Sequence, residues 1–382
     1  MEASATPHEI TKFTLQREDV ITTKDSENPL DIAIPSLVAE DLDGVLCGYH
    51  LAILRAEKRH LFGPYLSWLH VSQTIRAHYE MHATGITRWA IGRKHFKTCP
   101  VPLPPLPEQK RIATYLDARC AAIDRAVETK KKQLDTLDAL RKSIIQRAVT
   151  QGLNPKVKMK ESGVDWLGRV PKHWLCESLK RATSRIQTGS TPPTSQPVYY
   201  EEGTIEWFAP ECFSQTIKLR TPKKLINQQA FEDKKVRIFA PETVLFVGIG
   251  ATIGKVAVLE KEGSSNQQIV GISCDHRMIG RFLAYQLKNY ETIIPKLAQY
   301  TTLPILNQTK VGYLPVLRPP ISEQQEICEF LDNKELELAN VEKILNDQIS
   351  TLTAYRKSLI HECVTGKRRI SDADVTKVEA HV

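Results

Sequence analysis

Pro104-Pro-Leu-Pro-Glu-Gln-Lys-Arg-Ile-Ala-Thr-Tyr-Leu-Asp117 reads again, at an offset of 215 residues, as Pro319-Pro-Ile-Ser-Glu-Gln-Gln-Glu-Ile-Cys-Glu-Phe-Leu-Asp332. The match continues without a gap to Arg141-Lys-Ser-Ile-Ile145 and Arg356-Lys-Ser-Leu-Ile360. An internal repeat constrains architecture more strongly than any local pattern does. The chain is therefore predicted to contain two similar modules, each followed by a similar long segment.

Each copy of the repeat is predicted to form one long helix. Prolines block helix upstream, and Glu-Gln follows in the first turn, where acidic side chains favour the helix dipole. A seven-residue apolar series then runs through both copies, as in a coiled coil. It comprises Leu331, Leu338, Leu345, Leu352 and Leu359 in the second copy and Leu116, Ile123, Lys130, Leu137 and Ile144 in the first.

A companion series is predicted to complete the coiled-coil seam. It comprises Ile327, Lys334, Val341, Gln348 and Tyr355, matched by Ile112, Arg119, Ala126, Gln133 and Leu140. Its polar members would fix the register of the helices at some cost in stability. About 42 residues at roughly 1.5 Å each give a rod of about 60 Å, and an antiparallel pair would carry the modules at opposite ends. The alternative is a surface helix that packs on its own domain.

Charge is distributed unevenly along the chain. The sequence holds 52 Lys and Arg against 44 Asp and Glu, a net charge of +8. Residues 108–149 carry 10 basic and 6 acidic side chains, whereas residues 323–364 carry 4 basic and 9 acidic ones, so the two copies are expected to pair. Residues 171–320 carry 19 basic and 12 acidic side chains. This excess favours a polyanionic partner such as DNA, with ordinary solubilising charge an equal alternative.

The segments before the two helices are predicted to be α+β domains, since short β-like runs alternate with glycine turns. Gly63-Pro-Tyr-Leu-Ser-Trp68 resembles Gly280-Arg-Phe-Leu-Ala-Tyr285, and Glu18-Asp-Val-Ile-Thr resembles Glu242-Thr-Val-Leu-Phe. On this alignment the first module lacks the counterpart of residues 171–225, as a late start site or a truncated chain would produce. The predicted domains are the first module (1–103), the first helix (104–152), the second module (153–318), the second helix (319–366) and a tail (367–382).

Composition and termini predict a cytoplasmic protein. No apolar run reaches the roughly 18–20 residues of a membrane span, and the N-terminus shows no signal-peptide pattern. Eight scattered cysteines without CxxC spacing favour reduced thiols over a zinc site or a disulfide framework.

Two motifs resemble catalytic or metal sites but lack essential features. Gly248-Ile-Gly-Ala-Thr-Ile-Gly-Lys255 has neither the glycine spacing nor the following Ser or Thr of a phosphate loop, so a tight turn between strands is predicted. His78 and His82 stand four residues apart without an acidic or cysteine partner, which favours two ordinary helix histidines over a metal site. No catalytic triad can be assembled.

The stretch Met159-Lys-Glu-Ser-Gly-Val-Asp-Trp-Leu-Gly-Arg-Val-Pro-Lys-His-Trp174 resembles the segment that opens a target-recognition domain in the specificity subunits of type I restriction–modification systems. The segments Pro104-Pro-Leu-Pro-Glu-Gln and Pro319-Pro-Ile-Ser-Glu-Gln, each opening a long helix, extend the resemblance over nearly the whole chain. Full-length members of that family carry the Trp-Leu-Gly…Pro…His-Trp segment before both recognition domains, whereas here it occurs once. Recognition by the first module is therefore in doubt.

The resemblance implies a DNA-reading subunit that is not itself an enzyme. In this family each of two target-recognition domains reads one half of a split, asymmetric DNA sequence, and the paired helices set the length of the spacer. The helices also dock two methyltransferase subunits, which motor-nuclease subunits join. S-adenosylmethionine, ATP and magnesium are then expected in those partners, and no cofactor or metal in this chain. The alternative is a structural adaptor, or a partly defunct truncated subunit, that binds partner subunits without reading a full bipartite site.

Loop residues of the second module are the predicted DNA contacts, because basic side chains meet phosphates while amides and hydroxyls read base edges. The candidates are Lys180, Arg181, Arg185, Gln187, Thr188, Ser190, Lys218, Arg220, Lys223, Lys224, Lys255, Gln267, Thr301 and Thr302, with Thr87 and Arg88 in the first module. Basic clusters are more often solvated faces, and amides in turns equally often cap loops.

Overall fold

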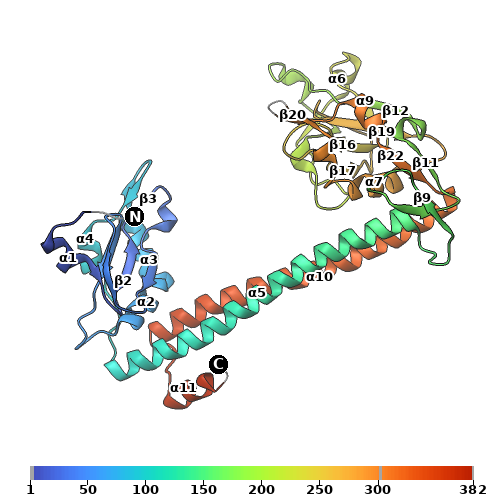
Figure 1. Ribbon diagram of the computed structural model, residues 1–382. Helices are drawn as coiled ribbons and strands as arrows, with labels where there is room; N and C mark the ends of the chain where they lie inside the picture. Colours follow the sequence, from blue (N-terminus) through green and yellow to red (C-terminus); the bar gives the residue numbers. More distant parts are fainter. Residues whose placement is uncertain (1–3, 301–302, 381–382) are drawn as a thin grey trace. The chain divides into compact units, whose positions relative to one another are not determined.

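The computed structural model describes residues 4–300 and 303–380 and confirms an α+β fold with two long helices (Figure 1). The chain forms two compact units. Unit 1 comprises residues 1–134 and 344–382, and unit 2 comprises residues 135–343. Each unit takes part of both long helices, so this division cuts across the linear domain boundaries predicted from the sequence.

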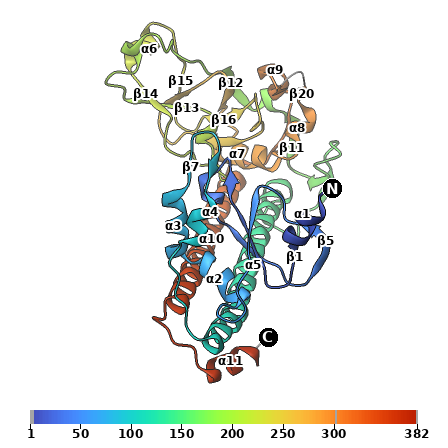
Figure 2. The same cartoon turned by 90° about the vertical axis from the view of Figure 1, so that its left-hand side faces the viewer.

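Unit 1 is built around a small antiparallel sheet of order β4-β2-β6. Strands β3, β8 and β7 form a second sheet, and β1 pairs with β5 beside α1 (Figure 2). The elements are α1 (Pro7–Phe13), β1 (Thr14–Leu15), β2 (Val20–Thr23), β3 (Asp25–Ser26), β4 (Pro35–Leu37), β5 (Leu42–Leu46), β6 (Leu51–Leu54), α2 (Gly63–Val71), α3 (Gln73–His82), β7 (Thr84–Gly85), β8 (Trp89–Ala90), α4 (Arg93–Lys97) and α11 (Asp372–Glu379).

Unit 2 contains two four-stranded sheets, of order β12-β19-β16-β17 and β14-β13-β18-β15. Shorter antiparallel pairs join β9 to β10, β11 to β22 and β20 to β21. The strands are β9 (Met159–Glu161), β10 (Arg169–Pro171), β11 (Leu175–Ser178), β12 (Thr183–Thr188), β13 (Ile205–Phe208), β14 (Lys224–Ile226), β15 (Ile238–Phe239), β16 (Val244–Val247), β17 (Val256–Val258), β18 (Gly263–Ser265), β19 (Ile269–Cys274), β20 (Gln299–Tyr300), β21 (Pro304–Ile305) and β22 (Pro315–Arg318). The helices are α6 (Gln228–Glu232), α7 (Gly280–Asn289), α8 (Ile294–Leu297) and α9 (Gln308–Gly312).

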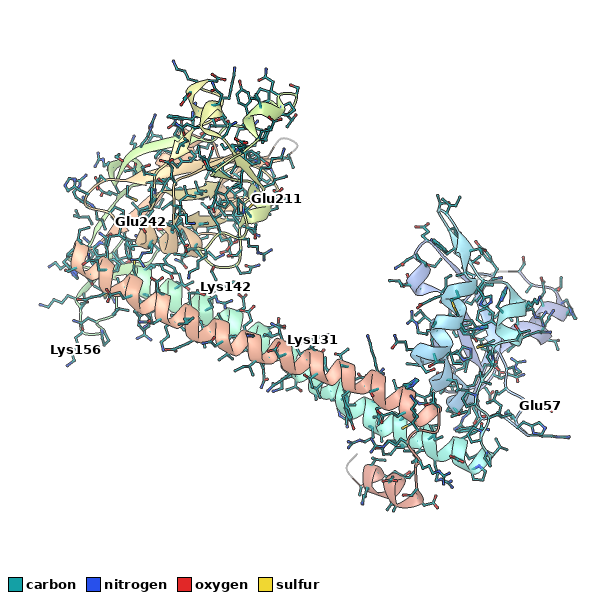
Figure 3. All side chains as sticks on the ribbon, turned by 180° about the vertical axis from the view of Figure 1, so that it is seen from behind. Glu57, Lys131, Lys142, Lys156, Glu211 and Glu242 are labelled. Atoms are coloured by element: carbon teal, nitrogen blue, oxygen red, sulfur yellow. The ribbon has the colours of Figure 1, made fainter. Side chains whose placement is uncertain are left out.

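The long helices α5 (Leu106–Gln151) and α10 (Ile321–Val364) pair antiparallel in both units (Figure 1 and Figure 3). In unit 2 the end of α5 at Gly152 lies against Glu323 at the start of α10, whereas Arg141 meets Glu335 and Glu342 further along α10. In unit 1 the Arg356 Nε atom lies 2.9 Å from a carboxylate oxygen of Asp124.

The leucine series follows the helix contact, whereas in the predicted companion series only Ile112 and Ile327 are buried. Leu116, Ile123, Leu331, Leu338, Leu345 and Leu359 are buried, while Leu137, Ile144 and Leu352 are half-buried. Arg119, Gln133, Leu140, Val341, Gln348 and Tyr355 are exposed instead. The second seam is shifted by one residue and runs through Cys120, Val127, Leu134, Arg141 and Ala148 of α5. Its equivalent on α10 includes Glu335, Glu342, Arg356 and Cys363, so the polar seam residues are two arginines and two glutamates rather than the glutamines.

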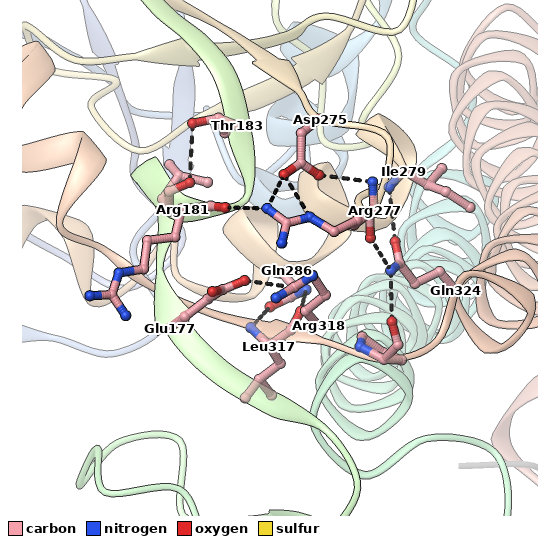
Figure 4. Close-up of polar contacts among 12 residues, drawn as sticks. Glu177, Arg181, Thr183, Asp275, Arg277, Ile279, Gln286, Leu317, Arg318 and Gln324 are labelled. Carbon is pink, nitrogen blue, oxygen red and sulfur yellow. Dashed lines mark hydrogen bonds and ion pairs between the residues drawn. The ribbon is translucent and has the colours of Figure 1, made fainter.

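Both modules attach to their long helix through the glutamine of the repeated Glu-Gln. Gln109 accepts a hydrogen bond from the Phe62 backbone N–H (2.8 Å) and donates to the carbonyls of His60 and Pro104. Gln324 accepts from the Ile279 N–H (2.8 Å) and donates to the carbonyls of Arg277 and Pro319, as Figure 4 shows in part. Both side chains are fully buried. We call each arrangement a glutamine socket.

The aspartate that ends the quoted repeat makes a second matched contact. The Trp68 indole N–H donates to Asp117 (2.8 Å), and the Tyr285 hydroxyl donates to Asp332 (2.7 Å). Because Trp68 and Tyr285 lie on α2 and α7, each module is fixed to its helix at two points separated by two turns. The two copies of the repeat therefore share the same structural contacts as well as similar sequences.

Glycines at the start of α2 and α7 permit the same close approach in both units. A Cβ atom at Gly63 would lie 2.1 Å from the Glu18 carbonyl oxygen, and one at Gly280 would lie 2.1 Å from that of Glu242. Glu18 and Glu242 both adopt left-handed backbone angles, with φ of 75° and 65°. The equivalence predicted upstream of the helices therefore extends to backbone conformation.

Candidate nucleic-acid interface

Several polar loops of unit 2 meet at one end of the sheet β12-β19-β16-β17. Strands β12 and β16 end there, and their antiparallel neighbours β19 and β17 begin there. The connections are residues 189–191, 248–255 and 266–268. We call this region the loop end. The segment 248–255 is a turn between two antiparallel strands, as predicted, and leads into no helix.

Backbone hydrogen bonds hold the first and third of these loops together. The Gly189 N–H donates to the Ile269 carbonyl (2.9 Å), and the Ser190 N–H donates to the Ser265 carbonyl (2.8 Å). A Cβ atom at Gly189 would lie 2.3 Å from the Ser265 hydroxyl, so only glycine allows this approach. The Thr191 hydroxyl donates to the side-chain oxygen of Gln267. The turn that follows β12 and the turn that precedes β19 therefore form one polar surface.

The glycine loop after β16 joins the same surface. The Gly248 N–H donates to the Gln268 carbonyl (2.8 Å), and the Gly250 N–H donates to the Pro304 carbonyl (3.1 Å). Gly250 has a φ of 107°, which favours glycine. The hairpin β20-β21 is thereby fixed to the loop end. The candidates Thr301 and Thr302 fall between these two strands and lie outside the described residues.

Amides and hydroxyls at the loop end resemble the groups that read base edges. Gln308 of α9 donates to the Ile186 carbonyl (2.7 Å) and accepts a hydrogen bond from Thr188 (3.4 Å). Asn266 donates to the Gln268 side chain (2.9 Å). Gln267 is exposed. Such a surface offers both donors and acceptors from a framework fixed by the backbone.

Basic residues border this surface on the side of the second sheet. The guanidinium of Arg237 donates to the Thr188 carbonyl. The Trp207 indole N–H donates to the Ser190 carbonyl (3.1 Å). Strand β14 begins at Lys224, which lies opposite Trp207 of β13. Lys224 Nζ lies 4.4 Å from the centre of the Tyr200 ring. Lys255 immediately precedes β17, also at the loop end.

Lys223 is less available than its neighbour, because it forms an ion pair with Glu211. The hydrogen bond from Lys223 lowers the pKa of the Glu211 carboxyl and raises that of Lys223. Lys223 is therefore held by a surface ion pair in this structure.

Three of the predicted contacts lie away from the loop end along β12. Lys180 and Arg181 precede the start of β12, at the opposite end of the sheet. The Lys180 ammonium lies 4.0 Å from the centre of the Tyr313 ring, and the Arg181 carbonyl accepts from Arg277 (3.1 Å), which is also paired with Asp275 (Figure 4). Arg185 is exposed within β12. The predicted basic cluster and the polar turn after it therefore belong to different ends of the sheet.

Lys218 and Arg220 are also separated from the loop end. Lys218 bridges to Val258, the last residue of β17, and the Arg220 N–H donates to the Cys212 carbonyl. Both side chains are exposed. The four basic residues 218–224 therefore divide between two regions rather than forming one cluster.

The counterpart of the β20-β21 hairpin in unit 1 is β7-β8, at the same offset of 215 residues. Thr87 is exposed in its turn. Arg88 bonds to Asp25 (2.6 Å) and to His50 (2.6 Å). Burial would raise the pKa of Asp25, but the hydrogen bonds from Arg88 and His50 outweigh it and hold that pKa below its ordinary value. Arg88 is thus committed to an internal ion pair.

The sequence did not single out Gln308 or Thr191. Gln308 follows Asn307, which caps α9, and resembles an ordinary helix start. Thr191 lies in a Thr-Pro-Pro run that suggested a turn. Their contribution depends on which strands are neighbours, and local sequence carries no signal for that.

The described helices include none that is both long and apolar enough to cross a membrane. Among the described residues, no group of three or more His, Cys, Asp or Glu side chains could hold a metal ion. The rings of His78 and His82 contact each other, and His82 bonds to the His78 carbonyl within α3.

Residues 184–350 match the family described as the type I restriction modification DNA specificity domain. The chain is 24% identical over 303 residues to the type I restriction enzyme MjaVIII specificity subunit of Methanocaldococcus jannaschii, covering 76% of this chain and 66% of that protein. It is 23% identical over 341 residues to the StySPI specificity subunit of Salmonella potsdam, covering 85% and 68%. The chain thus spans about two thirds of the length of these relatives.

A solved structure from work on complex assembly and conformational transition of the type I R-M system has a similar fold. It superposes with a TM-score of 0.74 at 20% identity, covering 92% of this chain and 82% of that one. At 20% sequence identity, this similarity is evidence for a shared fold alone. The family resemblance seen in the sequence is confirmed.

Proposed function

We propose that this chain, a relative of the type I restriction enzyme specificity subunits, is the DNA-recognition subunit of a type I restriction–modification system. The observation that carries the proposal is the loop end of unit 2. There, amide and hydroxyl side chains from separate loops gather beside Arg237, Lys224 and Lys255 within the residues that match the DNA specificity domain.

The proposed recognition divides the work between charge and hydrogen bonding. Lys224 and Lys255 would contact phosphates and position the unit, without sequence preference. Gln267, Asn266 and Thr191 would meet base edges in the major groove, where glutamine and asparagine pair well with adenine. The loops are fixed by backbone hydrogen bonds, so little ordering would be needed on binding.

The remaining parts of the proposal concern partners. The helix pair would dock two methyltransferase subunits, which motor-nuclease subunits join, and would set the separation of two half-sites. This chain would act without catalysis, and S-adenosylmethionine, ATP and magnesium would be bound by the partners, in the cytoplasm. The contacts within the helix pair support a rigid connector, because Arg141 of α5 forms ion pairs with Glu335 (3.3 Å) and Glu342 (2.8 Å) of α10.

Methylation sequencing tests the function. The chain would be expressed with its neighbouring methyltransferase subunit in cells that lack the system, and methylated adenines would be mapped across the genome. A split, asymmetric motif is expected if both units read DNA. A palindromic motif would indicate two chains that each read with unit 2. Absence of new methylation would contradict the proposal and favour a structural adaptor.

Matched substitutions test the site. On the DNA motif so identified, Gln267→Ala is expected to reduce discrimination at one base pair by about 1–3 kcal/mol. Lys255→Ala should instead weaken binding to all sequences alike and lower its salt dependence. Arg181→Ala, at the other end of β12, is the control and should leave both unchanged. Equal effects of Arg181→Ala and Gln267→Ala on base discrimination would refute the placement at the loop end.

A further inference from the structure

Three strands of unit 1 correspond to three strands of unit 2. In unit 1, β2 lies between its antiparallel neighbours β4 and β6, and in unit 2, β16 lies between its antiparallel neighbours β17 and β19. Glu18 and Glu242, which share a left-handed backbone, each stand two residues before the central strand. Strand β2 therefore corresponds to β16, β4 to β17 and β6 to β19.

The turn that follows the central strand is fixed in the same way in both units. In unit 1 the Lys24 N–H donates to the carbonyl of His50, the residue before β6 (3.1 Å). The Lys24 carbonyl accepts from the N–H of Ile91, the residue after β8 (2.9 Å). In unit 2 Gly248 makes both bonds, to the residue before β19 and to the residue after β21. The two units therefore share the backbone framework of the loop end.

Strand pairing holds the hairpin β7-β8 at the same end of unit 1. Asp25 of β3 pairs antiparallel with Ala90 of β8. In unit 2, Ile249 pairs antiparallel with Ile305 of β21. Figure 1 shows β3 at the end of unit 1 away from α2. We call this region the unit 1 loop end, and it comprises residues 24–26, 47–50 and 86–88.

The side chains of the unit 1 loop end differ in chemistry from those of unit 2. Tyr49 stands two residues before β6, as Gln267 stands two residues before β19. Its side chain is 77% exposed. Ile86, in the turn between β7 and β8, is 95% exposed. An aromatic and an aliphatic side chain therefore project where unit 2 presents an amide.

An internal ion pair lies beside these two side chains. The ring of Tyr49 lies against the ring of His50, with centres 3.7 Å apart. His50 contacts Asp25 and Arg88, and Arg88 also bonds to Asp25 (2.6 Å). Because Asp25 balances the charge of Arg88, this arginine is a weak attractant for phosphate. The tip of the hairpin therefore offers an apolar contact rather than a free cation.

We propose that Tyr49 and Ile86 contact thymine methyl groups in the major groove and so determine part of a half-site read by unit 1. The C5-methyl of thymine is the apolar group that the major groove presents, and apolar side chains are its usual contact. Unit 2 would instead read hydrogen-bonding groups through Gln267. This inference rests on the proposed function, since the equivalence to the loop end of unit 2 identifies the ligand as DNA.

Deoxyuridine in place of thymine tests the contact, because this base lacks only the C5-methyl group. The chain in complex with its methyltransferase subunit would be titrated with labelled duplexes that carry the motif found by methylation sequencing. The half-site of unit 1 is the one whose base preferences Gln267→Ala leaves unchanged. At least one deoxyuridine in that half-site should weaken binding about fourfold, the contribution expected from burying one methyl group.

Substitutions in the chain assign the methyl contact to its residues. Ile86→Ala and Tyr49→Ala should each weaken binding to the natural duplex by a similar factor. On at least one of these variants, the sensitive deoxyuridine should have no further effect. Leu103→Ala is the matched control, because Leu103 is also exposed but lies next to the start of α5. It should retain full affinity and full sensitivity to deoxyuridine.

The outcomes separate this inference from the proposed function. A split motif whose unit 1 half-site tolerates every deoxyuridine would overturn the methyl contact while leaving DNA recognition intact. Sensitivity that persists in both Tyr49→Ala and Ile86→Ala would overturn the assignment to these residues. A palindromic motif would also overturn it, because unit 1 would then read no half-site. Absence of any methylated motif would instead contradict the proposed function, and this inference with it.

Discussion

Unit 1 and unit 2 are alike where they meet the long helices and unlike in their central sheets. Gln109 and Gln324 form the same glutamine socket, and Asp117 and Asp332 accept from equivalent positions on α2 and α7. On the other side, unit 2 has β11 and β12, and the described residues of unit 1 form no counterpart of either strand. The contacts with the long helices are therefore equivalent in the two units, whereas the sheet that carries the loop end of unit 2 has one strand more.

The two regions also differ in how they are built. The socket relies on three backbone groups and one buried amide, so few substitutions preserve it. The loop end relies on turns attached to strand ends, which tolerate change in length and composition. In unit 1 the matching hairpin carries Arg88, which is paired with Asp25.

The largest effect is expected from removing a socket. Gln324→Leu leaves the Ile279 N–H and the carbonyls of Arg277 and Pro319 buried without this partner. At about 1–3 kcal/mol for each of these three groups, the free energy of unfolding of unit 2 should fall by roughly 3–9 kcal/mol. Gln109→Leu should have the same effect on unit 1. Urea denaturation followed by hydrogen exchange would assign each loss to its unit.

Gln133→Leu is the matched control, because Gln133 is exposed on α5. It should change stability by less than about 0.5 kcal/mol. The equivalence of the sockets would be disproved if Gln324→Leu unfolded unit 2 while Gln109→Leu left unit 1 unchanged.

A smaller loss of stability is expected from substituting a second matched pair of residues, Arg141 and Arg356. Arg141 and Arg356 occupy equivalent positions, but Arg141 is 6% exposed and Arg356 pairs with the more exposed Asp124. Arg141→Met would leave the largely buried Glu335 without its cation. Breaking a buried pair costs about 3–5 kcal/mol, and partial exposure of Glu342 reduces our expectation to about 2–3 kcal/mol.

Arg356→Met should cost less than about 1 kcal/mol, since its ion pair is near the surface. Thermal unfolding of both variants measures the difference. Adding Glu335→Leu to Arg141→Met should recover part of the loss, because it removes the unpaired charge. Equal destabilisation by Arg141→Met and Arg356→Met would show that the difference in burial does not make their ion pairs contribute differently to stability.

The smallest effect concerns pH. Burial raises the pKa of Glu335 above its ordinary 4.5, and the charge of Arg141 opposes that rise. The folded protein then holds this proton more tightly than the unfolded chain, so stability increases as the pH falls through the raised pKa. The equivalent residue of α5 is Cys120, whose pKa burial raises to about 11, so it stays neutral in this range.

Glu335→Gln should therefore flatten the dependence of unfolding free energy on pH just above 4.5, with a change below about 1 kcal/mol. Urea midpoints at a series of pH values measure it. Cys120→Ala should leave that slope unaltered. A steeper slope in Glu335→Gln would contradict the raised pKa.

The repeat made the two long helices predictable, because an ungapped match relates each position of one helix to a position of the other. The position of the second seam was not predictable. Ile112 and Ile327 suggested one phase, while the residues that lie in the contact include Arg141, Glu335 and Glu342, which no apolar pattern would select.

The candidate site was predictable in part. Gln187, Thr188, Ser190 and Gln267 lie at the loop end, because turns between strands attract polar side chains. Lys180 is close to them in sequence but lies at the other end of β12, since a strand separates its two ends by about 3.3 Å per residue. Gln308 joins them only through the hydrogen bonds of the folded unit.

The prolines at positions 100 and 102 have a consequence for solubility. An open sheet edge is a template for self-association, and proteins limit this danger with proline and with short strands. Here Val101 and Leu103 offer N–H groups, while the intervening Pro102 has none and Pro100 ends the series. Prolines at two of these four positions leave few N–H donors, so this segment is a poor template for pairing with a second chain.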